Sequence, residues 1–222
     1  MSQRTHNALL AGATGLVGRA LLAQLAADAG VAQVHALLRR APAPWPLNER
    51  IAALVVDFNA LPALPKADEA FCALGTTIGV AGSQAAFRAV DFDAVLNFAC
   101  AAQAAGARRF AVVSALGADA KSSVFYNRVK GEMEAALAAL GFDSLVIARP
   151  SLLTGARAAL GQPQRLGERL AIAATAPIAR LIPARWRPID AAVVARAMVQ
   201  ALRQSTPGRR VLESAELQTL GR

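Results

Sequence analysis

The chain has few residues of several types that mark particular classes of protein. Its 222 residues include two cysteines, Cys72 and Cys100, which excludes a disulfide framework, and neither has a metal-ligand spacing. Both lie in apolar segments, so we expect buried thiols in a reducing compartment. No apolar run is long enough to span a membrane without a charge or a helix breaker, and no signal-peptide core follows Met1. The sequence therefore predicts a cytoplasmic protein with no metal site and no membrane span.

Acidic and aromatic residues are also scarce. Fifteen acidic residues against 24 lysines and arginines give a net charge of +9, which permits nucleic-acid binding. The basic residues, however, are scattered from Arg4 to Arg222, and aromatic residues that could stack on bases make up only 5%. Without a clustered basic patch, no nucleic-acid partner is predicted.

Three glycines near the start of the sequence, Gly12, Gly15 and Gly18, have a spacing that indicates a function. An apolar segment at Asn7–Ala11 leads into the sequence GATGLVG at 12–18, and apolar residues at helical spacing follow. Strand, glycine turn and helix in this order are the context that dinucleotide binding requires. Gly12 would allow a tight turn, Gly15 the approach of a diphosphate, and Gly18 close packing of helix and strand. The cofactor-binding residues expected here are Gly12, Thr14, Gly15, Leu16 and Val17. The alternative is an ordinary β–α turn with incidental glycines.

The second predicted strand, Gln33–Leu38, indicates which cofactor is preferred. NAD-binding proteins usually carry an acidic residue about 20 positions beyond the glycines, on the ribose 2′-hydroxyl. This chain has Arg39 and Arg40 there, and guanidinium groups match the geometry of a phosphate. We therefore expect NADP(H) in preference to NAD(H). The alternative is that both arginines are solvated loop charges.

The only tyrosine, Tyr126, lies four residues before Lys130, one of three lysines. Residues four apart share one face of a helix, so the phenol and the ammonium would point into the same volume. A neighbouring ammonium favours phenolate and lowers the pKa of a tyrosine from its usual value of about 10. A tyrosine that acts as a general acid/base needs such a shift. Ser114 lies twelve residues upstream, at the end of an apolar strand.

Strands and helices alternate along the chain, which predicts an α/β fold with a single doubly wound parallel β-sheet. The expected strands are Asn7–Ala11, Gln33–Leu38, Ile51–Val56, Glu69–Leu74, Arg109–Ser114 and Ser144–Ala148. The expected helices are Gly15–Ala29, Gln84–Ala105, Ser123–Leu140 and Asp190–Gln204, and Ala41–Pro46 is expected to be a loop. We predict one Rossmann domain over residues 1–222, with a small C-terminal lid and terminal helix at 155–222.

In its motifs the chain resembles the atypical branch of the short-chain dehydrogenase/reductase superfamily, especially the Tat-interacting oxidoreductase-like group and bacterial epimerase/dehydratase-like proteins. The matching segments, in order, are GATGLVG at 12–18, LRR at 38–40, VVDF at 55–58, CALGTT at 72–77, VS at 113–114, YxxxKGE at 126–132 and ARP at 148–150.

The resemblance implies a role for each matching residue. Tyr126 would exchange the proton, Lys130 would bind the nicotinamide ribose, and Ser114 would hydrogen-bond the substrate carbonyl. The remaining cofactor contacts would come from Asp57 and Phe58 at the adenine, from Leu74, Gly75 and Thr76 along the ribose and diphosphate, and from Pro150, Leu152 and Leu153 near the carboxamide. Asp91 and Asn97 stand where related proteins place relay asparagines, although Asn97 is more simply explained as a polar residue bonded to nearby backbone.

These observations predict an NADP-dependent oxidoreductase that transfers hydride between NADPH and a carbonyl or alcohol substrate of low molecular mass. Two alternatives stay open: an NADPH-binding regulator or sensor with little turnover, and an enzyme like the nucleotide-sugar epimerases and dehydratases. The sequence also leaves a homodimer open. His6 and His35 have no recognisable catalytic partner and are expected to be structural.

Overall fold

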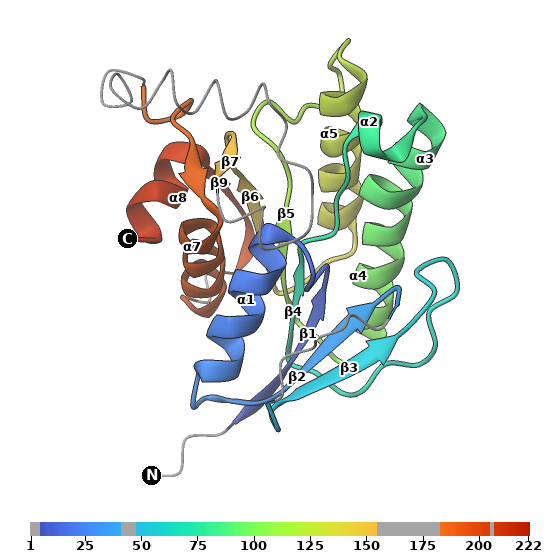
Figure 1. Ribbon diagram of the computed structural model, residues 1–222, viewed down its shortest axis with the longest axis vertical. Coiled ribbons are helices and arrows are strands. Elements are labelled where there is room, and N and C mark those ends of the chain that lie inside the picture. The colour runs from blue at the N-terminus through green and yellow to red at the C-terminus, as the bar shows by residue number, and fades with distance from the viewer. Residues whose placement is uncertain (1–4, 41–47, 155–182, 205–206) are drawn as a thin grey trace.

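The computed structural model describes residues 5–40, 48–154, 183–204 and 207–222. The predicted loop at 41–46 and most of the predicted lid, residues 155–182, lie outside the described residues. Within the described part, a central sheet separates two layers of helices (Figure 1).

All seven strands of the main sheet are parallel, in the spatial order β3-β2-β1-β4-β5-β6-β9. The strands are β1 (His6–Ala11), β2 (Val31–Leu38), β3 (Ile51–Val55), β4 (Glu69–Cys72), β5 (Arg109–Val113), β6 (Ser144–Arg149) and β9 (Gly208–Glu213). The order of strands reverses between β1 and β4, and ligands of such sheets bind at this point, beyond the carboxyl ends of the strands. The predicted doubly wound sheet is confirmed.

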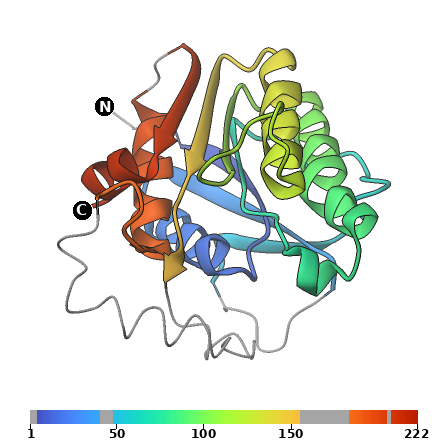
Figure 2. The ribbon, with the colours of Figure 1, turned by 90° about the horizontal axis from the view of Figure 1, so that it is seen from above.

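Helices cover both faces of the sheet (Figures 1 and 2). One layer contains α1 (Leu16–Ala27), α7 (Ala191–Arg203) and α8 (Ser214–Leu220). The other contains α3 (Gln84–Arg88), the π-helical turn η1 (Ala89–Asp93), α4 (Ala94–Ala104) and α5 (Phe125–Ala139), with the short α2 (Ile78–Ala81) before them. A pair of two-residue strands, β7 (Leu153–Thr154) and β8 (Ile189–Asp190), lies apart from the main sheet.

The central strands are apolar throughout because both of their faces are buried. Along β1, Ala8 and Leu10 enter the core formed with α1 and α7, whereas Leu9 and Ala11 enter the core formed with α4 and α5. All four side chains are inaccessible to solvent. This double burial fixes the register of the strand and thereby the place at which the glycine turn leaves it.

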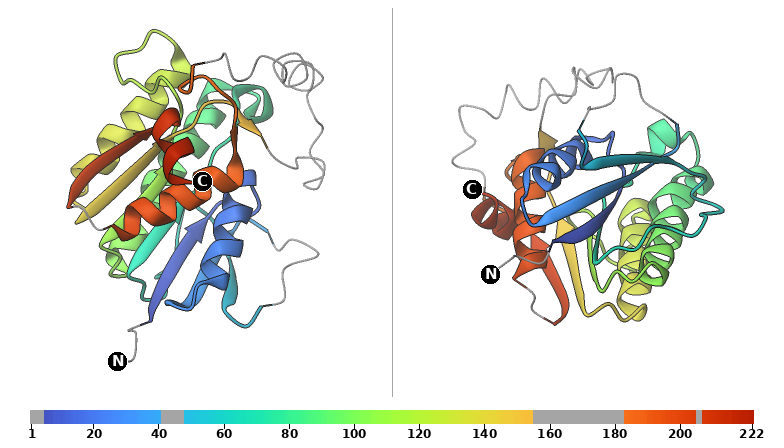
Figure 3. Two further views of the ribbon diagram at one scale, coloured as in Figure 1. Left: turned by 90° about the vertical axis from the view of Figure 1, so that its left-hand side faces the viewer. Right: turned by 90° about the horizontal axis from the view of Figure 1, so that it is seen from below.

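The structure corrects several details of the sequence prediction. The helix expected at Gln84–Ala105 is interrupted by η1, and Cys100 is exposed, although Cys72 is buried as expected. The strand β9 was not predicted; it extends the sheet beside β6 (Figure 3), where its polar sequence matches an edge position. Asp190, the first residue of the helix expected at Asp190–Gln204, is the N-cap of α7 and accepts a hydrogen bond from the amide of Ala192.

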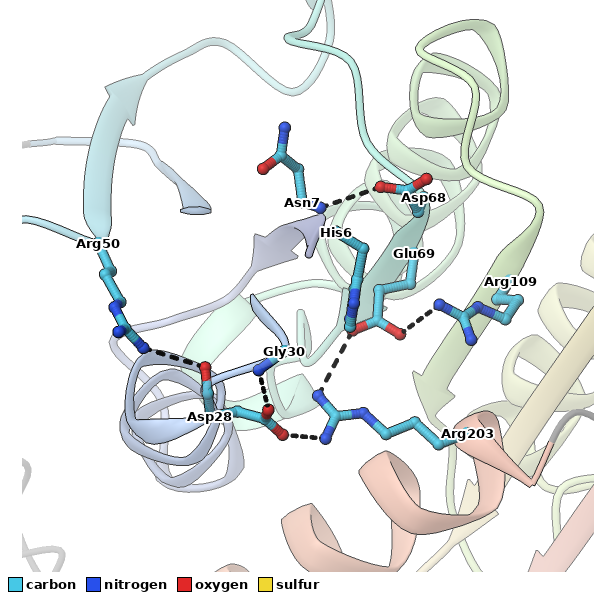
Figure 4. A network of polar contacts seen from close by, with 9 residues as sticks. All are labelled: His6, Asn7, Asp28, Gly30, Arg50, Asp68, Glu69, Arg109 and Arg203. Atoms are coloured by element: carbon cyan, nitrogen blue, oxygen red, sulfur yellow. Dashed lines mark hydrogen bonds and ion pairs between the residues drawn. The ribbon is translucent and has the colours of Figure 1, made fainter. Parts of the chain in front are cut away.

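A network of ion pairs lies at the amino-terminal edge of the sheet (Figure 4). The carboxylate of Glu69, at the start of β4, is fully buried and contacts His6 at 2.9 Å, Arg109 at 3.2 Å and Arg203 at 3.8 Å. Arg203, from α7, also pairs with Asp28 at the end of α1. The network therefore joins the first residues of three strands, β1, β4 and β5, to the end of α1 and to α7. It gives His6 the structural role expected of it.

Replacing Glu69 by Gln should destabilise the protein, because the half-buried guanidinium groups of Arg109 and Arg203 would lose the buried carboxylate that pairs with them. Breaking a buried ion pair from one side costs about 3 kcal/mol or more. The matched control is Asp143→Asn, which removes an exposed ion pair with Arg108 at 3.4 Å and should cost less than about 1 kcal/mol. Urea denaturation measures both values; equal losses in the two variants would contradict the importance assigned to the network.

Candidate nucleotide and catalytic site

The glycine turn has the geometry that the sequence predicted. Gly12 adopts φ +84°, which favours glycine, and a Cβ there would lie 2.5 Å from the backbone of Ala73. A Cβ on Gly18 would lie 1.9 Å from the carbonyl oxygen of Gly12, so helix α1 could not pack this closely on the turn with any larger residue. A Cβ on Gly15, by contrast, would meet only the Gly12 oxygen at 3.4 Å. Backbone atoms thus fill the space beside Gly12 and Gly18, whereas the space beside Gly15 is largely free.

Helix α1 begins at this turn without a side-chain cap. Its N-cap is Gly15, whose amide donates to the carbonyl of Gly12 at 3.0 Å, and Thr14 beside it is exposed. Leu16 and Val17 form the first helical turn, where backbone amides have no intrahelical acceptor. Such a helix start attracts anions. The predicted phosphate-binding residues are therefore brought together at one place, and that place suits a diphosphate.

The segment after β4 connects the glycine turn with the predicted catalytic residues. Its first residue, Ala73, packs against Gly12, and two residues later a Cβ on Gly75 would lie 3.4 Å from Asp91 and 4.0 Å from the ammonium of Lys130. The amide of Thr76 donates to Asp91 Oδ2 at 2.8 Å. Leu74 to Thr76 thus span the short distance between the two halves of the site.

Tyr126 and Lys130 lie one turn apart on α5, as predicted, but their electrostatics differ from the prediction. The Lys130 ammonium is buried and pairs with Asp91 Oδ1 at 2.7 Å. The Tyr126 ring packs against Phe87, with ring centroids 5.3 Å apart. Burial raises the pKa of Tyr126, the Lys130 ammonium lowers it, and the Asp91 carboxylate raises it again, so that the pKa lies above its ordinary value. The expected lowering was wrong because it left out burial and Asp91.

The ammonium itself is held in its charged form. Burial alone would lower the pKa of Lys130, but the Asp91 carboxylate and, less strongly, Tyr126 raise it above the ordinary value. Cys72, at the end of β4, is a buried neutral thiol whose pKa burial raises to about 12. Lys130 therefore remains a cation that can still donate hydrogen bonds to a ligand, since an ammonium has three donors.

Ser114 lies directly after β5, but its hydroxyl points to a partner that the sequence prediction did not include. It donates to Glu134 Oε1 at 2.5 Å, and both residues are buried. Arg149 binds the same carboxylate with two hydrogen bonds, at 3.0 and 2.6 Å, and reaches Glu213 on β9 at 3.0 Å. A hydroxyl has one proton to donate. In this arrangement Ser114 can accept a hydrogen bond from a ligand but does not donate one.

Glu134 could have been found from its spacing, since Tyr126, Lys130 and Glu134 follow each other at intervals of four and share one face of α5. What the sequence could not show is that the carboxylate turns toward Ser114 and Arg149. That contact depends on the neighbouring positions of β5 and β6 in the sheet.

The other predicted cofactor residues lie along the carboxyl edge with differing exposure. Arg39 and Arg40 are exposed directly after β2, the neighbour of β1, and Asp57 is exposed after β3. Phe58 is buried in the core beside α4, where its carbonyl accepts a hydrogen bond from Asn97 at 3.0 Å. Asn97 thus has the backbone-bonding role that was the simpler expectation.

The residues expected near the carboxamide follow β6. Pro150 is buried, and its carbonyl accepts a hydrogen bond from the amide of Leu116. Leu152 is 39% exposed, and Leu153 begins β7, which pairs with β8. This segment is therefore fixed by backbone hydrogen bonds and leaves one apolar side chain open to solvent.

The opposite edge of the sheet has a cavity of about 450 Å³, lined by Asp68, Arg108, Asp143 and Ser144 among others. These residues precede or begin β4, β5 and β6, so the cavity lies away from the glycine turn and Tyr126. Among the described residues, no group of three or more histidine, cysteine, aspartate or glutamate side chains could hold a metal ion. No helix in the described part of the chain is long and apolar enough to cross a membrane.

Comparisons with known proteins agree with this geometry. The family described as NAD(P)H-binding matches residues 12–205. Protein fmp52, mitochondrial, of Aspergillus niger is 35% identical over 159 residues, 68% of each chain. Protein FMP52, mitochondrial, of Chaetomium globosum is 30% identical over 228 residues, 96% of each chain. Protein HTATIP2 of Rattus norvegicus is 45% identical over 121 residues, which are 53% of this chain and 48% of the relative.

Solved structures share the fold at low identity. MoeE5 in complex with UDP-glucose and NAD has a TM-score of 0.70 and 18% identity, and the match covers 93% of this chain and 75% of that one. UDP-N-acetylglucosamine 4-epimerase from Methanobrevibacter ruminantium has a TM-score of 0.71 and 16% identity, covering 95% and 77%. The match over residues 12–205, the glycine turn and the sheet order together show that this chain belongs to the NAD(P)H-binding family of Rossmann proteins.

Proposed function

We propose that the protein is an NADP(H)-dependent oxidoreductase that acts on a carbonyl or alcohol substrate of low molecular mass. The observation that carries the proposal is the placement of the buried Lys130 ammonium, one helical turn after Tyr126, beside Gly75, which lies on the segment whose start packs against Gly12. A phosphate-binding turn and a proton-exchanging tyrosine are thereby joined through four residues of backbone. A dinucleotide bound along the carboxyl edge of the sheet would extend from the first to the second.

The residues of this chain fit a dinucleotide in the expected order. The open side of Gly15 and the uncapped start of α1 would bind the diphosphate, Asp57 would border the adenine, and Lys130 would bind the nicotinamide ribose with the donors that Asp91 leaves available. When bound, NADPH would supply the hydride.

In carbonyl reduction, Tyr126 would donate its proton to the substrate oxygen, since burial and Asp91 keep the phenol protonated. The Lys130 ammonium would stabilise the resulting phenolate by its charge. Ser114, held by Glu134, would accept a hydrogen bond from the alcohol hydroxyl of the product rather than donate one to the carbonyl.

Replacing Tyr126 by Phe should remove proton donation while leaving the ring packed against Phe87. We expect carbonyl reduction to fall at least about 100-fold, in line with the contribution of general acid catalysis, while NADPH binding changes little. NADPH consumption over a panel of aldehydes and ketones, with NADPH titration as the control, measures both quantities. A variant that retains full rate on a substrate turned over by the wild type would refute the mechanism.

The preference for NADP(H) is supported by the two exposed arginines after β2. The wild type should bind NADPH at least about tenfold more tightly than NADH, since hydrogen bonds to a charged group contribute about 1.5–3 kcal/mol. The variant Arg39→Ala/Arg40→Ala should lose this difference and retain its affinity for NADH. Titration of both cofactors against both proteins measures it; equal affinities in the wild type would contradict the preference.

A second candidate function is favoured by the hydrogen bond from Ser114 to Glu134. Because the Ser114 hydroxyl does not donate toward a ligand, the site has one donor fewer for a carbonyl oxygen, as a regulator that binds NADPH with little turnover could have. Tight NADPH binding without turnover on the carbonyl panel would favour this candidate. The compartment stays a prediction of cytoplasm, and the fungal relatives carry mitochondrial names.

A further inference from the structure

We infer that Asp91 is a positioning residue that balances the charge of Lys130 and thereby sets the site for carbonyl reduction, with Tyr126 as a proton donor. The inference deepens the proposed function and rests on it for the direction of reaction. Its main readout, the titration of Tyr126, needs no substrate.

Asp91 is a charged residue that is almost completely buried. It is 1% exposed, its Oδ1 lies 2.7 Å from the Lys130 ammonium, and its Oδ2 accepts the amide of Thr76 at 2.8 Å. Both oxygens are thus engaged, one with α5 and one with the loop after β4. A buried carboxylate is costly unless it is paired and hydrogen-bonded in this way.

The backbone around Asp91 is unusual as well. Asp91 is the central residue of η1, a π-helical turn between α3 and α4. Such turns are rare and occur frequently at functional sites. Phe87, just before η1, packs on the Tyr126 ring, so this segment supplies both the apolar wall of the tyrosine and the anion beside its lysine.

Among the described residues, the ionisable groups in the neighbourhood of Tyr126 and Lys130 come from four elements. From its own helix, α5, comes the Lys130 ammonium, and from η1 comes the Asp91 carboxylate. Cys72 of β4 interacts with Lys130, and it is a neutral thiol because burial raises its pKa to about 12. From α3, Arg88 pairs with Glu132 of α5 at 2.5 Å, and Arg128 lies 4.0 Å from the same carboxylate. The Lys130–Asp91 pair therefore dominates the field at the phenol.

The signs of these effects fix the protonation state of the tyrosine. An ammonium alone would favour phenolate, and a carboxylate alone would favour phenol. Because the two charges lie in contact, each cancels much of the other's effect, and burial then keeps the phenol neutral. Tyr126 is consequently an acid over the neutral pH range, which suits reduction, whereas alcohol oxidation would need alkaline conditions.

The test uses the fact that Tyr126 is the only tyrosine in the chain, so ultraviolet absorbance of phenolate reports this residue alone. In Asp91→Asn the Lys130 charge is no longer balanced, and the pKa of Tyr126 should fall by about one unit or more. Asp93→Asn is the matched control, because Asp93 belongs to the same π-helical turn but is exposed. It should titrate like the wild type. An unchanged titration in Asp91→Asn, or an equal fall in Asp93→Asn, would overturn the inference.

A second pair of variants covers the case in which Asp91→Asn does not fold. In Lys130→Met the carboxylate acts alone and the pKa of Tyr126 should rise, whereas in Asp91→Asn/Lys130→Met both charges are gone and the pKa should lie below that of Lys130→Met. Equal values in these two variants would contradict the inference. Circular dichroism at each pH shows that the titration is that of the folded protein.

The pH dependence of carbonyl reduction is an independent test. In Asp91→Asn the alkaline limb of the reduction pH profile should move to lower pH by the same amount as the phenolate titration. A shifted titration without turnover on any carbonyl would leave the role of Asp91 intact and contradict the proposed enzymatic function, so the two can fail separately.

Discussion

A buried ion pair between Asp91 and Lys130 connects the segments from which the proposed site is built. It joins α5, which carries Tyr126, to the π-helical turn after α3 and, through the amide of Thr76, to the loop after β4. That loop in turn begins at Ala73, which packs on Gly12. One ion pair thus connects the helix that carries Tyr126 with the segment that packs on the glycine turn. The pKa of Tyr126 is raised chiefly by burial, and the two opposite charges of the pair partly cancel each other's effect on the phenol.

The sheet makes this contact possible because its parallel strands end at one edge. Residues that follow β1, β4 and β5 are far apart in sequence but adjacent in space, as in other open α/β sheets. The amino-terminal edge has a different role, because there Glu69 and its basic partners join the strands to the helical layer of α1 and α7. The ion pairs at the amino-terminal edge stabilise the fold, whereas the Asp91–Lys130 pair lies at the proposed site.

Much of this could be predicted from the sequence. Glycine spacing, apolar strands and helical periodicity predicted the doubly wound sheet, and the chain order of the motifs predicted where Tyr126 and Lys130 would lie. The protonation of Tyr126 could not be predicted, because it depends on burial and on Asp91, 35 positions away. The direction of the Ser114 hydroxyl likewise depends on Glu134 and Arg149, which only the packing of α5 against the strands brings together. The edge strand β9 was missed because half-exposed polar strands have no apolar pattern.

The central claim is that a dinucleotide lies across the carboxyl edge with its nicotinamide end at Tyr126. A crystal structure with NADPH tests it most directly. The account predicts the diphosphate at Gly15 and the start of α1, a ribose hydroxyl on the Lys130 ammonium with the Asp91 pair retained, and the Tyr126 hydroxyl facing the nicotinamide. A cofactor bound elsewhere, or one whose nicotinamide lies away from Tyr126 while Lys130 contacts only Asp91, would contradict it.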